Sequence, residues 1–527
     1  MRVTSAAESV AWIEDGATVV VGGTGAVVEP DAVLHALEER FLAERRPRDL
    51  KVITPMCPGE RPGVGGLNCF AHDEMLNTIV SASFVPARHP RLLEMIAQDR
   101  CQAYTASMGA LVQLMTAIGA DKPGVFTRAG LDSFLDPRHG GGRMNTVSME
   151  PPCRIVEIDQ REYIFYPAPS VDVAIVRGSV ADEDGYISCE EESNILAASD
   201  LALAAKASGG RVIVQVDRIV PRGSLDPQLV RIPGPLVDDL VVVPRKGASP
   251  SPGFVSLYGR EAFMSGRERG PVTDALPVEP SGGRTILRRA ALELSPGDVV
   301  NVGAGVPTHL PRILLEEGLL EHVTITNEHG IFGGLLGTAF GGTFVASINP
   351  LAIMDSTFQF NFYDGGGLDI AFLGMGEVDR LGNVNVSRFG PVVNGSGGFT
   401  NITERADRIV FCGTLTAGGL EVQCSDGRVT ILKEGRHQKF GKSVEEVTFR
   451  AARARAHGQK VLYVTERAVF DLTENGLRLI EVAPGVDVDR DVLAHMSFEP
   501  IIGSDLSLMP PAALDADRIQ FKERPTL

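Results

Sequence analysis

An internal repeat constrains the fold of this sequence more than any other feature. Residues 15–38 and 296–317 share one order: a glycine, a β-branched apolar run, a G-x-G turn, a proline and a helical pattern. This order predicts a strand, a glycine-rich turn and a helix, since Pro30 and Pro307 fall near the first helical turn, where a missing N–H costs little. Self-similarity of this kind indicates duplicated supersecondary units. We therefore expect two related halves.

A second pair of matched segments supports the duplication. Residues 171–189 align without gaps with residues 368–386, and in both an apolar strand leads to an acidic loop, a turn glycine and a second short strand. The matched positions are Asp172 with Asp369, Asp182 with Asp379, and Gly185 with Gly382. The paired segments lie about eighty residues further apart in the first half than in the second. We infer an insertion in the N-terminal half, near residues 70–150.

The predicted fold class is α/β, with two related open α/β domains whose sheets are mostly parallel. A chain of 527 residues is long enough for two or more domains. Segments rich in Pro, Gly and Ser at 244–254 and 277–284 mark a junction, so we expect an N-terminal domain at 1–275 and a C-terminal domain at 280–527. Largely apolar runs suit parallel strands covered on both faces. The clearest runs are 212–216, 409–412 and 461–464.

Charge and composition exclude several classes of partner. The formal net charge of −17 argues against nucleic acid or an anionic membrane as the main partner, because both attract basic surfaces. No run approaches the ~18 apolar residues of a membrane span, and the N-terminus lacks a basic segment followed by an apolar one. The seven cysteines are scattered without a C-x-x-C pair, which favours a reduced, cytoplasmic location. No metal-ligand spacing such as H-E-x-x-H occurs, so we expect no metal site.

Glycine is the departure in composition, with 58 residues in short clusters beside apolar runs. The G-x-G turns at 23–25 and 303–305 suggest a dinucleotide fingerprint, but Val28 and Thr308 stand where its third glycine would be. Two interpretations stay open. Each turn is either a tight strand-to-helix connection or a helix N-terminus that presents N–H groups to an anion or a developing oxyanion.

A glutamate stands among the glycines of the segment 324–337. The apolar, β-branched start of this segment predicts a buried strand, and Glu328 comes at its carboxyl end. Burial disfavours a carboxylate, and neighbouring glycines leave room for another group beside it. We interpret Glu328 as a nucleophile or base open to a substrate. The alternative is a helix cap or a salt-bridged glutamate at a strand end.

Two further segments could contact an anion. Successive glycines at 397–398 could turn two backbone N–H groups toward one point, with a bare turn as the alternative. Ser396 lacks a nucleophile motif, because G-x-S-x-G would need glycine at Asn394. A basic cluster in this acidic chain could contact a phosphorylated ligand, or could be a solvated loop. Its members are Lys433, Arg436, Lys439 and Lys442.

Together these features resemble a family I coenzyme A transferase of the fused, single-chain propionate/acetoacetate (3-oxoacid) type. The resemblance rests on the two halves, the N-x-G-x-G-x-P turn at 301–307, the Glu328-x-Gly330 strand end and the G-x-G-G turn at 395–398. It extends over nearly the whole chain. Stretches at 109–111, 122–145 and 463–502 also match it.

The resemblance implies a mechanism in which Glu328 is the catalytic nucleophile. CoA would move from an acyl-CoA to a small carboxylic acid by ping-pong steps, through an acyl-glutamyl anhydride and a glutamyl-CoA thioester. Coenzyme A is then a substrate, no cofactor is needed, and a homodimer or homotetramer is expected. The implied oxyanion or substrate-binding residues are Gly303, Gly305, Gly397, Gly398 and Met108, and the implied CoA contacts are Gly330 and Lys439.

Two other functions stay open at this stage. The first is an acyl-CoA thioesterase or CoA-dependent hydrolase on the same fold, in which water replaces the acceptor acid. The second is a non-catalytic acyl-CoA-binding subunit, against which the intact Glu328 argues.

One position departs from the family pattern. Relatives often carry a Gln in a T-P-Q-G-type turn that helps to polarise the substrate carbonyl, whereas the corresponding stretch 105–109 places Met108 there. Methionine cannot donate that hydrogen bond. Either Ser107 or a backbone amide substitutes, or the acyl pocket is more apolar, or the activity differs.

Overall fold

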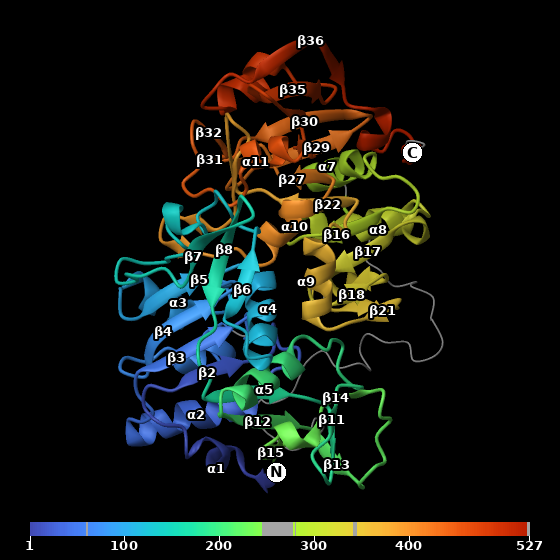
Figure 1. Ribbon diagram of the computed structural model, residues 1–527. Coiled ribbons are helices and arrows are strands. Elements are labelled where there is room, and N and C mark those ends of the chain that lie inside the picture. Colours follow the sequence, from blue (N-terminus) through green and yellow to red (C-terminus); the bar gives the residue numbers. More distant parts are fainter. Residues whose placement is uncertain (60–61, 245–277, 280, 341–344, 524–527) are drawn as a thin grey trace.

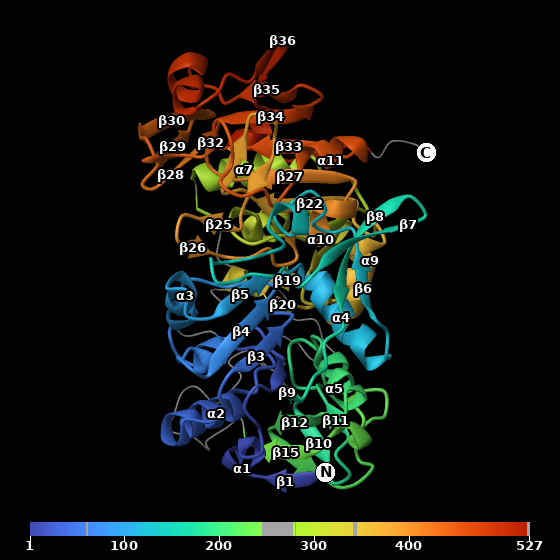
Figure 2. The same ribbon diagram turned by 60° about the vertical axis from the view of Figure 1, so that its left-hand side comes forward.

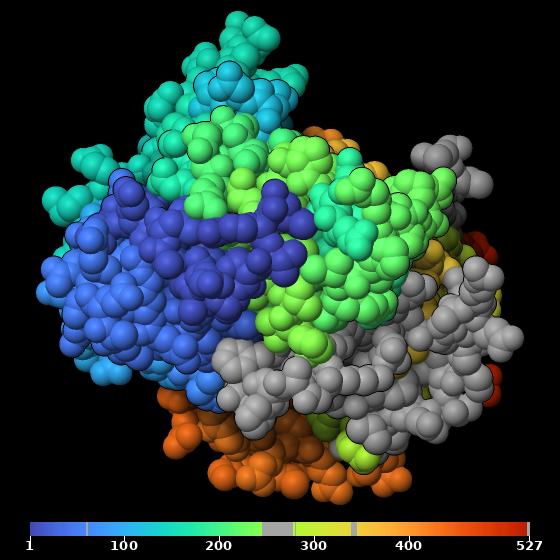
Figure 3. All heavy atoms as spheres, turned by 90° about the horizontal axis from the view of Figure 1, so that it is seen from below, coloured from blue at the N-terminus to red at the C-terminus, as the bar shows by residue number. Residues whose placement is uncertain are grey.

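The computed structural model describes residues 1–59, 62–244, 278–279, 281–340 and 345–523. Two sheets, one from each half of the chain, form its core. The N-terminal half occupies the lower part of Figure 1 and the C-terminal half the upper part, and Figure 2 shows the same division after rotation. Seen from below, the N-terminal half covers most of the coloured surface (Figure 3). No helix among these residues is both long and apolar enough to cross a bilayer.

The N-terminal sheet has eight strands, and every neighbouring pair in it is parallel. Its order is β1 (Arg2–Thr4), β15 (Asp239–Val242), β12 (Arg211–Val216), β9 (Val173–Arg177), β2 (Thr18–Val21), β3 (Leu50–Thr54), β4 (Leu76–Ser81) and β5 (Gln102–Thr105). The helices of this half are α1 (Ala6–Val10), α2 (Asp31–Glu44), α3 (Pro90–Ala97), α4 (Met108–Gly119) and α5 (Ala198–Ala207).

The C-terminal sheet has ten strands, with a parallel centre, antiparallel pairs on both sides of it and a parallel outermost pair at one edge. Its order is β21 (Ala352–Ile353), β18 (Ile331–Phe332), β17 (Thr324–Asn327), β16 (Val299–Val302), β22 (Ile370–Gly374), β27 (Arg408–Cys412), β33 (Lys460–Val464), β34 (Ala468–Thr473), β35 (Gly476–Val482) and β36 (Ile501–Leu508). The helices here are α7 (Gly282–Ala291), α8 (Leu310–Glu316), α9 (Ser356–Asp364), α10 (Phe399–Arg405) and α11 (Ala451–Ala456).

The predicted repeat is present in both sheets. The order β3-β2-β9-β12-β15 in the first half corresponds to β17-β16-β22-β27-β33 in the second. The matched aspartates make equivalent hydrogen bonds. Asp172 Oδ2 accepts from the backbone N–H of Thr18 at 2.8 Å, and Asp369 Oδ2 accepts from that of Val299 at 2.7 Å. Each carboxylate thus ties the start of one central strand to its neighbour. The three apolar runs expected to be parallel strands are β12, β27 and β33.

The acidic loops of the repeat also correspond. Asp182 Oδ1 accepts from two backbone N–H groups of the following loop, each at 3.0 Å, and Asp379 Oδ1 does the same. Gly185 and Gly382 have φ of 81° and 88°, which favours glycine in both turns. These loops join β10 (Val180–Asp182) to β11 (Ile187–Ser188) and β23 (Glu377–Asp379) to β24 (Val384–Asn385).

The segment predicted as an insertion extends the N-terminal half. Residues 70–150 supply β4, β5, α3, α4 and β6 (Gly124–Thr127), and β6 joins the hairpin of β7 (Arg154–Ile158) and β8 (Arg161–Pro167) in a separate small sheet. The predicted domain junction lies largely outside the described residues, so its position stays a prediction.

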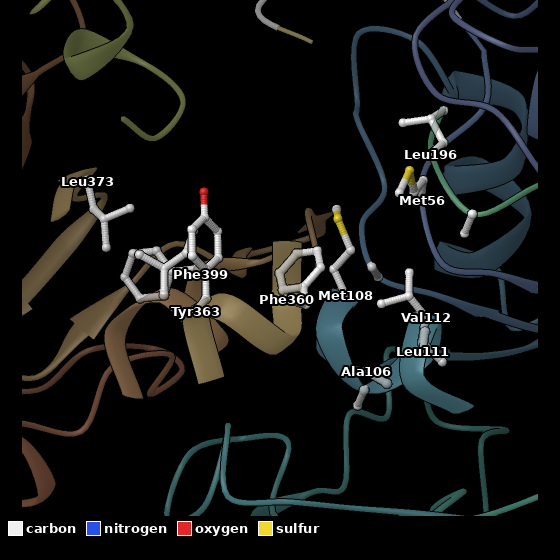
Figure 4. Packing of buried hydrophobic residues seen from close by; sticks show 14 of the residues in the cluster. Met56, Ala106, Met108, Leu111, Val112, Leu196, Phe360, Tyr363, Leu373 and Phe399 are labelled. Atoms are coloured by element: carbon white, nitrogen blue, oxygen red, sulfur yellow. The ribbon is translucent and has the colours of Figure 1, made fainter. Parts of the chain in front are cut away.

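The two halves pack against each other through α4 and α9. One hydrophobic cluster includes buried residues of both halves, among them Met56 and Met108 from the first and Phe360 and Phe399 from the second. Figure 4 shows Met108 at the start of α4 beside Phe360 on α9. The carboxyl ends of the strands in both sheets therefore adjoin a shared apolar wall, where open α/β sheets bind ligands.

Candidate active site

Glu328 lies in a three-residue hairpin loop at the end of β17. Asn327 pairs with Ile331 of β18, so residues 328–330 form the turn, and Gly330 adopts a φ of 91°. Asn327 Oδ1 accepts from the backbone N–H of His329 at 2.8 Å, a local bond that asparagine commonly makes in turns. Asn327, His329 and Gly330 are buried, whereas Glu328 keeps partial exposure. The loop therefore presents this one carboxylate to the surroundings.

The Glu328 carboxylate lies directly against the backbone of Gly398. A Cβ at position 398 would be far inside van der Waals contact with Glu328 Oε2, so only glycine leaves room for the carboxylate. The Gly398 N–H donates to Glu328, but desolvation outweighs this bond and raises the pKa of the carboxyl to about 7. A carboxylate that is unfavourably buried, and whose pKa is close to 7, is suited to covalent catalysis near pH 7.

A tyrosine network fixes the strand beneath Glu328. The Tyr363 hydroxyl donates to Thr326 Oγ1 at 2.9 Å and accepts from Asn301 Nδ2 at 3.0 Å. Burial is the main cause of the raised pKa of Tyr363, and the negative charge of Glu328 adds to it. Tyr363 is therefore a neutral hydrogen-bonding group close to the candidate nucleophile.

The N-terminal half holds the loop from the other side. Asn194 Nδ2 donates to the carbonyl of His329 at 3.0 Å and to that of Val345 at 3.1 Å. The His329 side chain is buried, and desolvation together with the charge of Arg88 lowers its pKa to about 3. His329 is thus neutral, and its Nδ1 lies 2.8 Å from Asn327 Oδ1, which makes Nδ1 the donor.

The start of α4 has no spare N–H to polarise a substrate carbonyl. The N–H of Met108 donates to the carbonyl of Gly397 at 2.9 Å, and that of Gly109 donates to Asn401 Oδ1 at 3.1 Å. Ser107 Oγ caps the helix by accepting from the N–H of the residue three positions later at 3.3 Å. Of the alternatives that the sequence left open, substitution by these backbone amides is excluded. The Met108 side chain instead lies in the apolar cluster beside Phe360.

Two of the glycines predicted as oxyanion donors use their N–H groups elsewhere. The Gly303 N–H donates to the carbonyl of Phe372 at 2.8 Å, within the sheet edge. The Gly397 N–H donates to the carbonyl of Ala82 at 2.7 Å, so the predicted nest of two N–H groups at 397–398 is wrong. Gly398 does face Glu328, as a packing partner and as a donor to the carboxylate. Gly305, with a φ of 86°, is exposed and has no atom near its missing Cβ.

The two predicted CoA contacts have different surroundings. Gly330 is buried, and a side chain there would collide with the backbone of Met354, so the structure places it against protein and not at a ligand surface. Lys439 Nζ lies over Gly413, where a Cβ would be 2.8 Å away. Desolvation lowers its pKa to about 8, with Glu466 acting in the opposite sense. No described residue lies within hydrogen-bonding or ion-pair distance of this ammonium group.

The rest of the basic cluster is ordinary surface. Lys433 is exposed and pairs with Glu421 at 3.0 Å, Arg436 donates to the carbonyl of Gly418, and Lys442 is exposed. The solvated-loop interpretation therefore fits these three, while Lys439 is set apart by its burial.

Sequence reasoning missed the residues that reach the site from other elements. Asn194 follows β11, and Gln359, Phe360 and Tyr363 lie on α9. None of them belongs to a recognisable motif. The only available signal was the polar Gln359 on the otherwise buried face of a short helix.

One group of potential metal ligands occurs among the described residues, away from Glu328. His35, Glu38 and Cys69 bring donor atoms within 4.8 Å of one another. Arg91 lies 2.9 Å from Glu38 Oε1 and already supplies a positive charge there. The expectation of no metal site stays a prediction.

Comparison with known proteins agrees with the fold and identifies the class of enzyme. The chain belongs to the coenzyme A transferase family: the family model "Coenzyme A transferase" matches residues 3–243, and full-length relatives match nearly the whole chain. It is a CoA-transferase, and enzymes of this family act on acyl-CoA and carboxylic acid substrates.

Three relatives illustrate the match. Acetate CoA-transferase YdiF of Escherichia coli (strain K12) is 38% identical over 511 residues, covering 96% of this chain and 94% of the relative. Caffeate CoA-transferase of Acetobacterium woodii is 39% identical over 516 residues, covering 96% of each. The crystal structure of the acyl-CoA transferase (YdiF) apoenzyme from Escherichia coli O157:H7 superposes with a TM-score of 0.88 at 36% identity, covering 98% of this chain and 96% of that one.

Proposed function

We propose that Glu328 is the nucleophile of this CoA-transferase. The observation that carries the proposal is a partly exposed glutamate in a glycine-bounded loop, whose desolvated carboxyl has one backbone donor and a pKa of about 7. A solved structure of the similar E. coli O157:H7 enzyme is described as a thioester complex with CoA, which supports a covalent CoA intermediate.

The chemistry follows from the carboxylate. Glu328 attacks the thioester carbonyl, the C–S bond breaks, and CoA leaves as a thiolate while an acyl-glutamyl anhydride forms. The thiolate then attacks the glutamyl carbon, which forms a glutamyl-CoA thioester and releases the first carboxylate. A second carboxylic acid reverses these steps and leaves as a new acyl-CoA. Each intermediate retains the free energy of the thioester.

The ends of the neighbouring strands supply a route for the CoA tail. β16, β22 and β27 lie side by side; β22 ends at Gly374, and Gly303 and Gly413 directly follow the last residues of β16 and β27. Beyond them lies the ammonium group of Lys439, which is more than half enclosed by protein and carries no partner among the described residues. We infer that CoA lies along these side-chain-free strand ends, with a phosphate group near Lys439.

The acyl group would meet an apolar wall. Met108 from the N-terminal half and Phe360 from the C-terminal half lie beside each other, and Phe360 also approaches Gly398, where Glu328 rests. Such surroundings favour an acyl group without a polar substituent at this position.

Covalent trapping tests the assignment of Glu328. The enzyme would be incubated with acetyl-CoA without an acceptor acid, treated with borohydride or hydroxylamine, digested and measured by mass spectrometry. We expect modification of the 324–337 peptide and an activity loss on the order of 10³–10⁶-fold for Glu328→Gln. Glu321→Gln, at an exposed glutamate nearby, is the matched control. An unmodified peptide together with an active Glu328→Gln variant would refute the proposal.

The remaining expectations concern assembly and surroundings. We propose a homodimer or homotetramer, a cytoplasmic location, and coenzyme A as a substrate with no resident cofactor. Light scattering of the purified protein at several concentrations would measure the oligomeric state directly.

A further inference from the structure

Gln359 on α9 is a buried amide that makes no well-formed hydrogen bond with the described residues. Its side chain has no exposed surface. Neither its oxygen nor its nitrogen meets the geometry of a hydrogen bond to a described residue, although the Tyr363 hydroxyl lies near enough to interact with it. Burying an unpaired amide is costly, and most buried polar groups in proteins are bonded. An exception of this kind often belongs to a functional site.

The position of Gln359 brings this amide close to Glu328. Gln359 lies one helical turn before Tyr363, on the same face of α9, and its side chain adjoins the Tyr363 hydroxyl. The charge of Glu328 acts on the same hydroxyl. The residue after Gln359 is Phe360, whose ring approaches Gly398, the glycine that contacts Glu328. Gln359 and Glu328 therefore flank the same tyrosine.

Other nearby donors are already engaged. The tetrahedral intermediate of acyl transfer needs hydrogen-bond donors aimed at its oxyanion, and Gly398 donates to Glu328 itself. Four other backbone candidates donate to protein acceptors; they are Gly303, Gly397, Met108 and Gly109. The last candidate, Gly305, lies in an exposed turn.

We propose that the side-chain amide of Gln359 donates a hydrogen bond to the thioester carbonyl oxygen as it becomes an oxyanion. This inference rests on the proposed role of Glu328. As the bond from the Glu328 oxygen to the carbonyl carbon forms, the carbonyl π pair moves onto the substrate oxygen, where the amide N–H stabilises it. The C=O bond then re-forms and the C–S bond breaks, with its electron pair leaving on the CoA sulfur. No proton is transferred to or from Gln359.

Steady-state kinetics of Gln359→Met provide the first test. Methionine keeps the length of the side chain and removes the amide, so we expect kcat to fall about 10²–10³-fold with KM for acetyl-CoA changed only a few-fold. Gln113→Met is the matched control, because the Gln113 amide bonds Asn361 and Asp364 at the junction of α4 and α9. A kcat within threefold of the wild type would overturn the inference. Gln359→Leu, which also lacks a donor and adds no charge to this buried position, is a second variant if the first folds poorly.

Vibrational spectroscopy separates hydrogen bonding from a merely structural role. [1-¹³C]Acetyl-CoA would be bound to the Glu328→Ala protein, and its thioester C=O stretch compared with that in water. We expect a shift to lower frequency that is lost in the Glu328→Ala/Gln359→Met double variant. If the C=O frequency in the double variant equals that in Glu328→Ala, the role of Gln359 is contradicted while the role of Glu328 is not. Turnover by Glu328→Ala would instead contradict the proposed nucleophile.

Discussion

Two glutamates near the carboxyl ends of parallel strands are held in opposite ways. In the N-terminal half, Glu29 is 2% exposed, and its Oε1 accepts from the backbone N–H groups of Ala26 at 2.9 Å and Gly59 at 2.5 Å. In the C-terminal half, Glu328 is partly exposed and receives one backbone N–H, from Gly398. The duplicated fold thus places a glutamate near the carboxyl ends of parallel strands in both halves. The number of donors and the access to solvent distinguish a structural carboxylate from a candidate nucleophile.

The glycine turns of the two halves also differ in how closely protein packs around them. At Gly23, a Cβ would lie 2.6 Å from the Glu29 side chain, so the first turn closes around its glutamate. At Gly305 in the second turn nothing lies near the missing Cβ. The N-terminal edge is filled by protein, and the C-terminal edge is open.

Of the substitutions that test this difference between the two glutamates, replacing Gly398 should reduce the reaction rate most. Gly398→Ala would place a methyl group inside van der Waals contact with Glu328 Oε2, and a displacement of about 1 Å in a catalytic group costs about 10²-fold in rate. The φ of Gly398 is −86°, so alanine causes no backbone strain and the loss would come from the contact. Steady-state kcat measures it, with Gly283→Ala at the start of α7 as the control. Full activity would show that the carboxylate need not rest on Gly398.

The pH dependence of the reaction should report the raised pKa of Glu328. Only the carboxylate attacks, so kcat/KM should fall about tenfold per pH unit once the pH is well below 7 and level off above it. His329, with a pKa lowered to about 3, stays neutral over this range. Glu446→Gln serves as the control, because burial raises the pKa of Glu446 to about 7 as well. If kcat/KM no longer fell at low pH in the Glu446→Gln variant, the fall would belong to Glu446 and not to Glu328.

Lys439 should affect binding and not the chemical step. Lys439→Met removes the proposed phosphate contact, so KM for acetyl-CoA should rise roughly tenfold with kcat nearly constant, a change of about 1.4 kcal/mol. Because the pKa of Lys439 is lowered to about 8, the wild-type KM should also rise above pH 8, and the variant should lack this rise. Lys433→Met, at an exposed lysine, is the control. An unchanged KM would place the phosphates elsewhere.

Glu29 should affect folding and leave the chemistry intact. Glu29→Ala would leave two buried backbone N–H groups without their acceptor, which costs about 1–3 kcal/mol of stability. The only tryptophan of the chain is Trp12, so its fluorescence during urea unfolding reports on the N-terminal half. Glu14→Ala, at an exposed position, is the control. A large loss of kcat in the folded variant would mean that both halves contribute a reactive carboxylate.

The sequence allowed the fold to be predicted because the repeat places identical residue types at equivalent structural positions. Asp172 and Asp369 occupy matched positions and make the same bond to a neighbouring strand. Glu328 was identifiable since a carboxylate at the end of an apolar strand, next to glycines, is unfavourable without a function. The sequence could not show which backbone N–H groups are free to bind a substrate, because their acceptors lie far away in sequence. The carbonyl of Phe372 accepts from the N–H of Gly303, and that of Ala82 accepts from the N–H of Gly397.

Residues that reach the site from distant parts of the sequence could not be predicted for the same reason. Asn194 bonds the carbonyl of His329 from a loop 135 positions earlier, and Gln359 comes near Glu328 because Tyr363 on the same helix bonds Thr326 of β17. Neither residue belongs to a local motif. The role of Asn194 depends on how the two halves pack together, and that of Gln359 depends on how α9 packs within the C-terminal half.

The hydrogen bond from Gly397 to the carbonyl of Ala82 has a consequence for how this enzyme could change over time. The backbone on which the Glu328 carboxylate rests is positioned by a strand end of the opposite half. Substitutions around Ala82 and Ser83 would therefore alter reactivity without touching either substrate. In a selection for new acceptor acids, adaptive changes are expected to accumulate there as well as in the acyl pocket.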